Sequence, residues 1–98
     1  MRVGILGGTF DPVHVGHVAL ARAALTELNI EKLLVLPNGA PQYKRPRTDP
    51  ADRLAMACMA MGTINRVEVS DMEILRGGAT YAVDTLRILK SAHPDTDY

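Results

Sequence analysis

Residues 2–17 read RVGILGGTFDPVHVGH, and this stretch decides the fold. Residues 2–6 are a short, mostly aliphatic run that Gly7 and Gly8 end, as is typical of a strand buried on both faces. From Gly16 onward, apolar residues recur at the spacing of a helix. A strand, a tight turn and a helix therefore follow one another, and the free backbone N–H groups of such a helix start favour an anion.

The alternation of strand and helix continues along the chain. The first helix is predicted to run from Gly16 to about Leu28, with Asn29 as a left-handed cap. A second apolar run, KLLVL at residues 32–36, stops at Pro37, so the first 36 residues predict a parallel βαβ unit. The apolar residues expected on the inner side of the first helix are Val18, Ala21, Leu25 and Leu28.

The second half of the chain repeats this order. A second helix is expected over residues 50–61, where Asp49 caps it, Pro50 occupies its first turn and Gly62 stops it. Its side chains expected in the core are Met56, Cys58, Met59 and Met61. A third strand is expected at residues 66–69, with residues 72–75 as its extension. A third helix is expected from about Thr80 to His93, with one apolar side made of Val83, Leu86 and Leu89.

Composition and charge bound the function. At 98 residues there is room for one domain, and 47% hydrophobic with 22% charged residues is typical of a folded, soluble chain. Eleven basic and eleven acidic side chains cancel, which excludes a general attraction for nucleic acid or an anionic membrane. No apolar run approaches the roughly 20 residues of a membrane span. The single Cys58 agrees with a reducing compartment, so we expect the protein in the cytoplasm.

His14 and His17 are two of the three histidines in the chain. Because residues i and i+3 at a helix start lie on one face, both imidazoles are able to donate N–H groups to one anion. Two alternatives stay open. Zinc is the first, although no third ligand lies nearby in the sequence. The second is a purely structural role of both histidines as surface or capping residues.

The stretch GGTFDPVHVGH at residues 7–17 resembles the (T/H)xGH signature of the nucleotidyltransferase superfamily, in the form found in bacterial nicotinate mononucleotide adenylyltransferases. Three weaker motifs follow in the family's order: Pro37 with Asn38, residues 52–56 with Arg53, and TYAVDTL at residues 80–86. Two departures are Tyr43, where the family usually has histidine before the lysine at position 44, and Ala82, where it has a hydroxyl residue.

The resemblance implies transfer of AMP from ATP to nicotinate mononucleotide, with Mg²⁺ accompanying ATP, to give deamido-NAD and pyrophosphate. The 5′-phosphate of the acceptor is then the nucleophile, and catalysis consists of positioning and charge neutralisation. The catalytic residues implied are His14, His17 and Lys44, with no metal ligand from the protein. The residues implied to bind ATP and its phosphates are Gly7, Gly8, Thr9, Phe10, His14, Gly16 and His17. Those implied to bind the nicotinate nucleotide are Asp11, Tyr81, Ala82 and Thr85.

Four of these residues have structural interpretations as well. Phe10 is expected to pack and Asp11 to cap the turn, while packing of Tyr81 under the third helix and a solvated loop around Lys44 stay open as alternatives. The fold implied is α/β, a Rossmann-like doubly wound parallel sheet. Residues 1–98 are expected to be the N-terminal part of a single nucleotidyltransferase domain, a βαβαβα half truncated before the fourth strand. The first strand is then an exposed parallel edge that offers a surface for self-association.

Two other functions remain open at this point. One is a different adenylyl or cytidylyl transfer within the same superfamily. The other is a nucleotide-binding module or fragment without catalytic activity. The partners expected are ATP and nicotinate mononucleotide, and neither nucleic acid nor a membrane.

Overall fold

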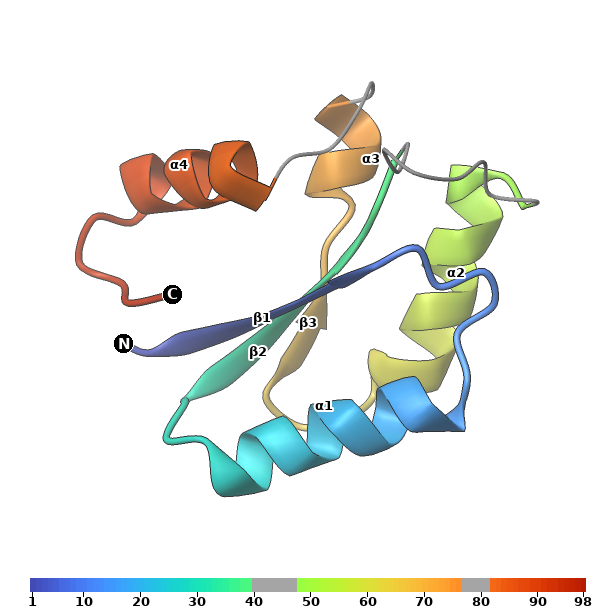
Figure 1. Ribbon diagram of the computed structural model, residues 1–98, viewed down its shortest axis with the longest axis horizontal. Helices are drawn as coiled ribbons and strands as arrows, with labels where there is room; N and C mark the ends of the chain where they lie inside the picture. The colour runs from blue at the N-terminus through green and yellow to red at the C-terminus, as the bar shows by residue number, and fades with distance from the viewer. Residues whose placement is uncertain (40–47, 77–81) are drawn as a thin grey trace.

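A parallel sheet with helices on both faces forms the protein (Figure 1). The computed structural model describes residues 1–39, 48–76 and 82–98. In chain order its elements are β1 (Val3–Gly8), α1 (Val15–Glu27), β2 (Lys32–Pro37), α2 (Pro50–Met61), β3 (Val67–Val69), α3 (Met72–Arg76) and α4 (Ala82–Ala92). The predicted α/β architecture is confirmed.

The sheet has the order β1-β2-β3, and both pairs are parallel. Val3 lies opposite Lys32 at one end of the first pair, and Gly8 lies opposite Pro37 at the other. The central strand β2 is buried from its second residue to its last, because helices cover both of its faces. This explains why its sequence is a continuous apolar run and not an alternating one.

Side chains of β1 alternate between two cores. Leu6 points to the face covered by α1 and α2, whose cluster comprises Phe10, Ala21, Leu25, Leu33, Val35, Ala57 and Met61. Val3 and Ile5 point to the opposite face, where Leu34 and Leu36 meet Met72 of α3 and Leu89 of α4. By the same alternation, Gly7 lies on the α3 and α4 face and Gly8 on the α1 and α2 face.

Two local expectations were wrong. Residues 72–75 are not a strand extension but part of α3, in which the Leu75 N–H donates to the Asp71 carbonyl at 2.9 Å. The Ser70 hydroxyl oxygen accepts from the Met72 N–H at 3.3 Å and starts this turn. Asn29 is not a left-handed cap, because Leu28 ends α1 in an extended conformation.

The inner side of α2 also differs from the expectation. Residues four apart, Arg53, Ala57 and Met61, are buried, so the sheet-facing stripe starts with a charged side chain. Met61 is in the core as predicted, but Met59 is 81% exposed and Cys58 is exposed, so the prediction was wrong for both. Asp49 precedes α2 at the cap position without a side-chain cap hydrogen bond.

Helix α4 packs on the sheet through fewer side chains than predicted. Leu89 contacts the second core, and Thr85 is the buried residue of the helix. Val83 and Leu86 are exposed, so the predicted apolar side is only partly used. No helix among the described residues is long and apolar enough to cross a membrane.

The outer edge of β1 is covered only at its start. Asp97 forms a parallel bridge with Arg2, in which the Val3 N–H donates to the Asp97 carbonyl at 2.7 Å and the Asp97 N–H donates to the Met1 carbonyl at 2.8 Å. The two termini therefore lie side by side (Figure 1). Within the described part of the chain, residues 4–8 have no strand on this side.

Candidate functional site

The turn after β1 is built around Phe10. Its ring is 3% exposed and belongs to the core under α1 and α2, so the predicted packing role is confirmed. Its φ of 51° is a left-handed conformation that a bulky residue rarely adopts. A Cβ at residue 8 would lie 3.1 Å from this ring, so glycine at that position lets the ring fold back under the strand.

His14 and His17 form a reciprocal cap at the start of α1. His14 is the N-cap residue, and its Nδ1 accepts from the Gly16 N–H at 3.1 Å. Nδ1 of His17 accepts from the His14 N–H at 3.0 Å. A Cβ at residue 16 would lie 2.9 Å from Cε1 of His14, so the glycine between the histidines gives the first ring its space. The two imidazoles stack with their centroids 3.9 Å apart.

The cap fixes the tautomer of both rings. A nitrogen that accepts a hydrogen bond carries no proton, so in each neutral imidazole the proton is on Nε2. The prediction that both rings lie on one side of the helix start is confirmed. The capping and anion-binding interpretations are compatible, because capping uses Nδ1 and leaves two Nε2–H donors at the positive end of α1. The described residues contain no group of three or more potential metal ligands.

Burial lowers the pKa of His17 below its ordinary value of 6.5, and the adjacent His14 lowers it further. The unfolded chain therefore takes up this proton at a higher pH than the folded chain does. We expect the free energy of unfolding to be largest above about pH 6.5, to fall as the pH drops below that value, and to level off below the folded pKa. Protonation of Nδ1 also removes the acceptor that caps His14.

Urea unfolding across the range from about pH 7.5 to about pH 5 tests this dependence. Glutamine at the third position of a helix caps in the same way and does not titrate, so His17→Gln is the matched variant. Its stability is expected to fall less with acid than that of the unaltered chain. Identical pH profiles for the two proteins would contradict the role of His17.

A pocket of about 410 Å³ lies at the carboxyl ends of β1 and β2, a volume in the range of small-molecule sites. Its lining residues are Ile5, Gly7, Leu36, Asn38, Glu73, Ala82, Thr85 and Leu86. Three residues that the sequence places in two different motifs, Gly7, Ala82 and Thr85, meet here. Among the described residues, a Cβ at residue 7 would have only the Leu36 carbonyl oxygen within 4.0 Å, so their packing does not require this glycine, whereas a ligand lying against the strand would.

Asp11 and Thr85 both make contacts within the chain. Asp11 Oδ2 accepts from the Thr48 N–H at 3.3 Å, which ties the β1–α1 turn to the residues before α2. The Thr85 hydroxyl donates to Glu73 Oε1 at 2.8 Å and accepts from Arg76 at 3.0 Å. Lys44 and Tyr81 lie outside the described residues.

Arg53 is a residue of the site that sequence reasoning noted in a motif but gave no role. It is fully buried and donates to four backbone carbonyls, those of Thr48 (3.1 Å), Thr9 (2.9 Å), Asn38 (2.6 Å) and Gly39 (2.9 Å). Burial lowers its pKa, and the nearby Asp11 carboxylate opposes that shift. One guanidinium thus holds together the turn after β1, the end of β2 and the start of α2.

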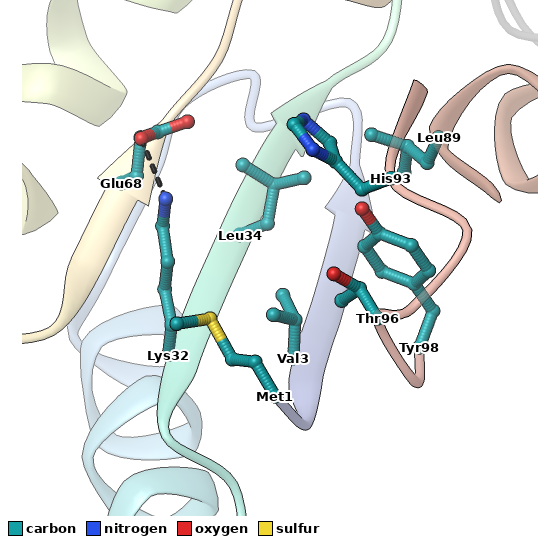
Figure 2. Close-up of a pocket in the computed structure, with 9 residues that line it drawn as sticks. All are labelled: Met1, Val3, Lys32, Leu34, Glu68, Leu89, His93, Thr96 and Tyr98. Atoms are coloured by element: carbon teal, nitrogen blue, oxygen red, sulfur yellow. Dashed lines mark hydrogen bonds and ion pairs between the residues drawn. The ribbon is translucent and has the colours of Figure 1, made fainter. Parts of the chain in front are cut away.

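A second pocket, of about 360 Å³, lies at the opposite ends of the strands. Figure 2 shows Val3 and Leu34 on its sheet side, His93 and Tyr98 across from them, and the ion pair of Lys32 with Glu68 (2.8 Å) at its rim. Ligands of open parallel sheets bind at the carboxyl ends of the strands. The pocket with Gly7 is therefore the candidate site.

Comparisons with known proteins show what the chain is similar to. The probable nicotinate-nucleotide adenylyltransferase of Synechococcus sp. (strain JA-3-3Ab) is 44% identical over 99 residues, covering 99% of this chain and 48% of the relative. That of Desulfitobacterium hafniense (strain Y51) is 45% identical over 95 residues, covering 95% of this chain and 46% of the relative. The chain thus spans about half the length of these curated relatives.

The fold is also found in a solved structure. The nicotinic acid mononucleotide adenylyltransferase of Plasmodium falciparum, solved in complex with NaAD, superposes with a TM-score of 0.80 at 21% identity, covering 97% of this chain and 48% of that one. The family model described as cytidylyltransferase-like matches residues 5–98, which include the glycine turn, both histidines and the start of α4. The chain belongs to the cytidylyltransferase-like family.

Proposed function

We propose that this protein transfers AMP from ATP to nicotinate mononucleotide, giving deamido-NAD and pyrophosphate in NAD biosynthesis. The observation that carries the proposal is the pair of stacked imidazoles whose Nε2–H groups are left over at the start of α1, next to the Gly7 and Gly8 turn. The names of the two bacterial relatives supply the substrate class.

In this reaction a phosphate oxygen of nicotinate mononucleotide attacks the α-phosphorus of ATP, and the bond to the β-phosphate oxygen breaks as pyrophosphate leaves. No side-chain nucleophile is needed, so the protein contributes orientation and donors for the charge that moves onto pyrophosphate. His14 and His17 donate from Nε2 to phosphate oxygens, and Gly7, Gly8, Thr9, Phe10 and Gly16 form the turn around them. Lys44 adds a cation to the same phosphates.

The acceptor nucleotide occupies the pocket between β1, β2 and α4. Its nicotinate carboxylate, an anion, is favoured near the N-terminal end of α4, at Ala82. Tyr81 and Thr85 belong to the same segment, and Asp11, in the turn after β1, is the other residue assigned to the mononucleotide. The contact of Thr85 is made through its backbone or methyl group, since its hydroxyl is already used.

Mg²⁺ is proposed to enter with ATP. The described residues contain no cluster that would hold a metal by itself, and Mg²⁺ at such sites takes most of its ligands from substrate phosphates and water. When bound, it would neutralise charge on the triphosphate. No residue of this chain is assigned to it.

Three further points belong to the proposal. Residues 1–98 make up the first part of one nucleotidyltransferase domain, in line with the half-length match to the relatives. The reaction takes place in the cytoplasm, in line with the exposed free thiol of Cys58. Copies of the chain associate through the uncovered edge of β1 at residues 4–8, which light scattering would detect as a mass above that of the monomer.

Pyrophosphate release tests the activity directly. The chain is mixed with nicotinate mononucleotide, Mg²⁺ and either ATP or CTP, and a parallel reaction omits the mononucleotide. We expect release with ATP that depends on the mononucleotide. Pyrophosphate release with CTP but not with ATP would favour cytidylyl transfer. Calorimetric binding of ATP without any pyrophosphate release would favour a non-catalytic nucleotide-binding module. If the chain shows no ATP binding and no pyrophosphate release, the proposal is contradicted.

A further inference from the structure

Glu73 is a buried carboxylate with one oxygen unused. The side chain is 4% exposed and lines the pocket at the carboxyl ends of the strands. Its Oε1 accepts from the Thr85 hydroxyl at 2.8 Å, whereas Oε2 is buried without any hydrogen-bond partner among the described residues. Buried polar atoms in native proteins are nearly always paired, because leaving one unpaired costs about 1–3 kcal/mol or more.

The neighbour that binds Oε1 does not satisfy Oε2 as well. The Thr85 hydroxyl donates its one proton to Oε1 and accepts a hydrogen bond from Arg76, so it has no second proton to donate to Oε2. Glu73 thus lines the pocket with an oxygen that none of the described residues satisfies, and a ligand bound there is able to supply the donor.

We propose that Oε2 of Glu73 accepts a hydrogen bond from a ribose hydroxyl of the mononucleotide bound in this pocket. The inference rests on the proposed function. At neutral pH the nicotinate carboxylate and the phosphate carry no donor, so the ribose hydroxyls are the donors that nicotinate mononucleotide offers. Carboxylates recognise ribose hydroxyls in the same way in dinucleotide-binding sheets. A negative charge here also keeps the nicotinate carboxylate away from Glu73 and toward the start of α4.

Calorimetric titration of the chain with nicotinate mononucleotide and with its 2′-deoxy and 3′-deoxy analogues tests this contact. A hydrogen bond to a charged group corresponds to about a tenfold to hundredfold change in affinity. We expect one of the analogues to bind more weakly than the parent by this factor. No binding of the parent would overturn both the proposed function and this inference, whereas equal binding of all three ligands would overturn the inference alone.

The Glu73→Gln variant tests the same contact from the side of the protein. Its amide oxygen keeps the hydrogen bond from Thr85, and its NH₂ group replaces the acceptor Oε2, so the variant should bind the parent and the analogue equally. If Glu73→Gln does not fold, Glu73→Asp, whose carboxylate is withdrawn by one methylene, takes its place with the same expectation. The matched control is Glu68→Gln at the opposite end of the strands, which should keep the full preference for the parent. A full preference in the Glu73 variant would overturn the proposal.

Discussion

Replacing Arg53 with methionine will lower the free energy of unfolding by about 3–5 kcal/mol. Methionine fills much of the same volume but has no donor, so four backbone carbonyls around it lose their partner in a buried place. The free energy of unfolding of a small domain is about 5–15 kcal/mol in total, so the variant keeps only part of its stability. Urea unfolding followed by circular dichroism measures the loss.

Two variants make this result interpretable. Arg22 is an exposed arginine on α1, and Arg22→Met should change the free energy of unfolding by less than about 0.5 kcal/mol. Arg53→Lys keeps the charge but not the planar fork of donors, so it should recover only a fraction of the loss. An Arg53→Met protein within about 1 kcal/mol of the unaltered chain would show that water replaces the guanidinium at these carbonyls.

The role of Arg53 illustrates where sequence reasoning stops. Its position in a helix is predictable from Asp49, Pro50 and the spacing that follows, but its partners are backbone carbonyls up to 44 residues away. Carbonyls carry no residue-specific signal, so only the folded chain identifies them. The same applies to the pocket, where the packing of α4 on the sheet brings Thr85 near Gly7 although 78 residues separate them.

Hydrophobic patterns predicted the elements correctly where the sequence fits only one kind of secondary structure. The apolar runs of β1 and β2 and the helical spacing of α1 predicted elements whose ends differ from the structure by at most two residues. The segment after β3 was wrong because four residues, MEIL, fit either a strand or a helical turn, and Ser70 decided in favour of the turn. The prediction for Met59 and Cys58 was wrong because it rested on their hydrophobicity alone. In the structure, the buried positions of α2 are every fourth residue from Arg53 onward.

His17→Glu will abolish nucleotide binding while leaving the fold intact. Glutamate at the third position of a helix accepts from the N-cap N–H as His17 does, so the reciprocal cap survives. The variant loses the edge contact with Phe10 and the stack on His14, each worth about 0.5–1.5 kcal/mol, but gains about 0.3–1 kcal/mol from a negative charge in the first turn, where α1 has none. The free energy of unfolding should therefore fall by about 1–2 kcal/mol, which leaves the chain folded.

Nucleotide binding, unlike the stability of the fold, should be lost in this variant. The Nε2–H donor is replaced by a carboxylate that repels phosphate, and loss of one hydrogen bond to a charged group alone weakens affinity about tenfold to a hundredfold. Calorimetric titration with ATP and Mg²⁺ should therefore give no detectable binding for His17→Glu and weakened binding for His17→Gln, which removes the imidazole without adding charge. His93→Glu, at the far pocket, is the matched control and should bind ATP as the unaltered chain does. ATP binding retained by a folded His17→Glu protein would place the phosphates elsewhere and reduce the histidine pair to a helix cap.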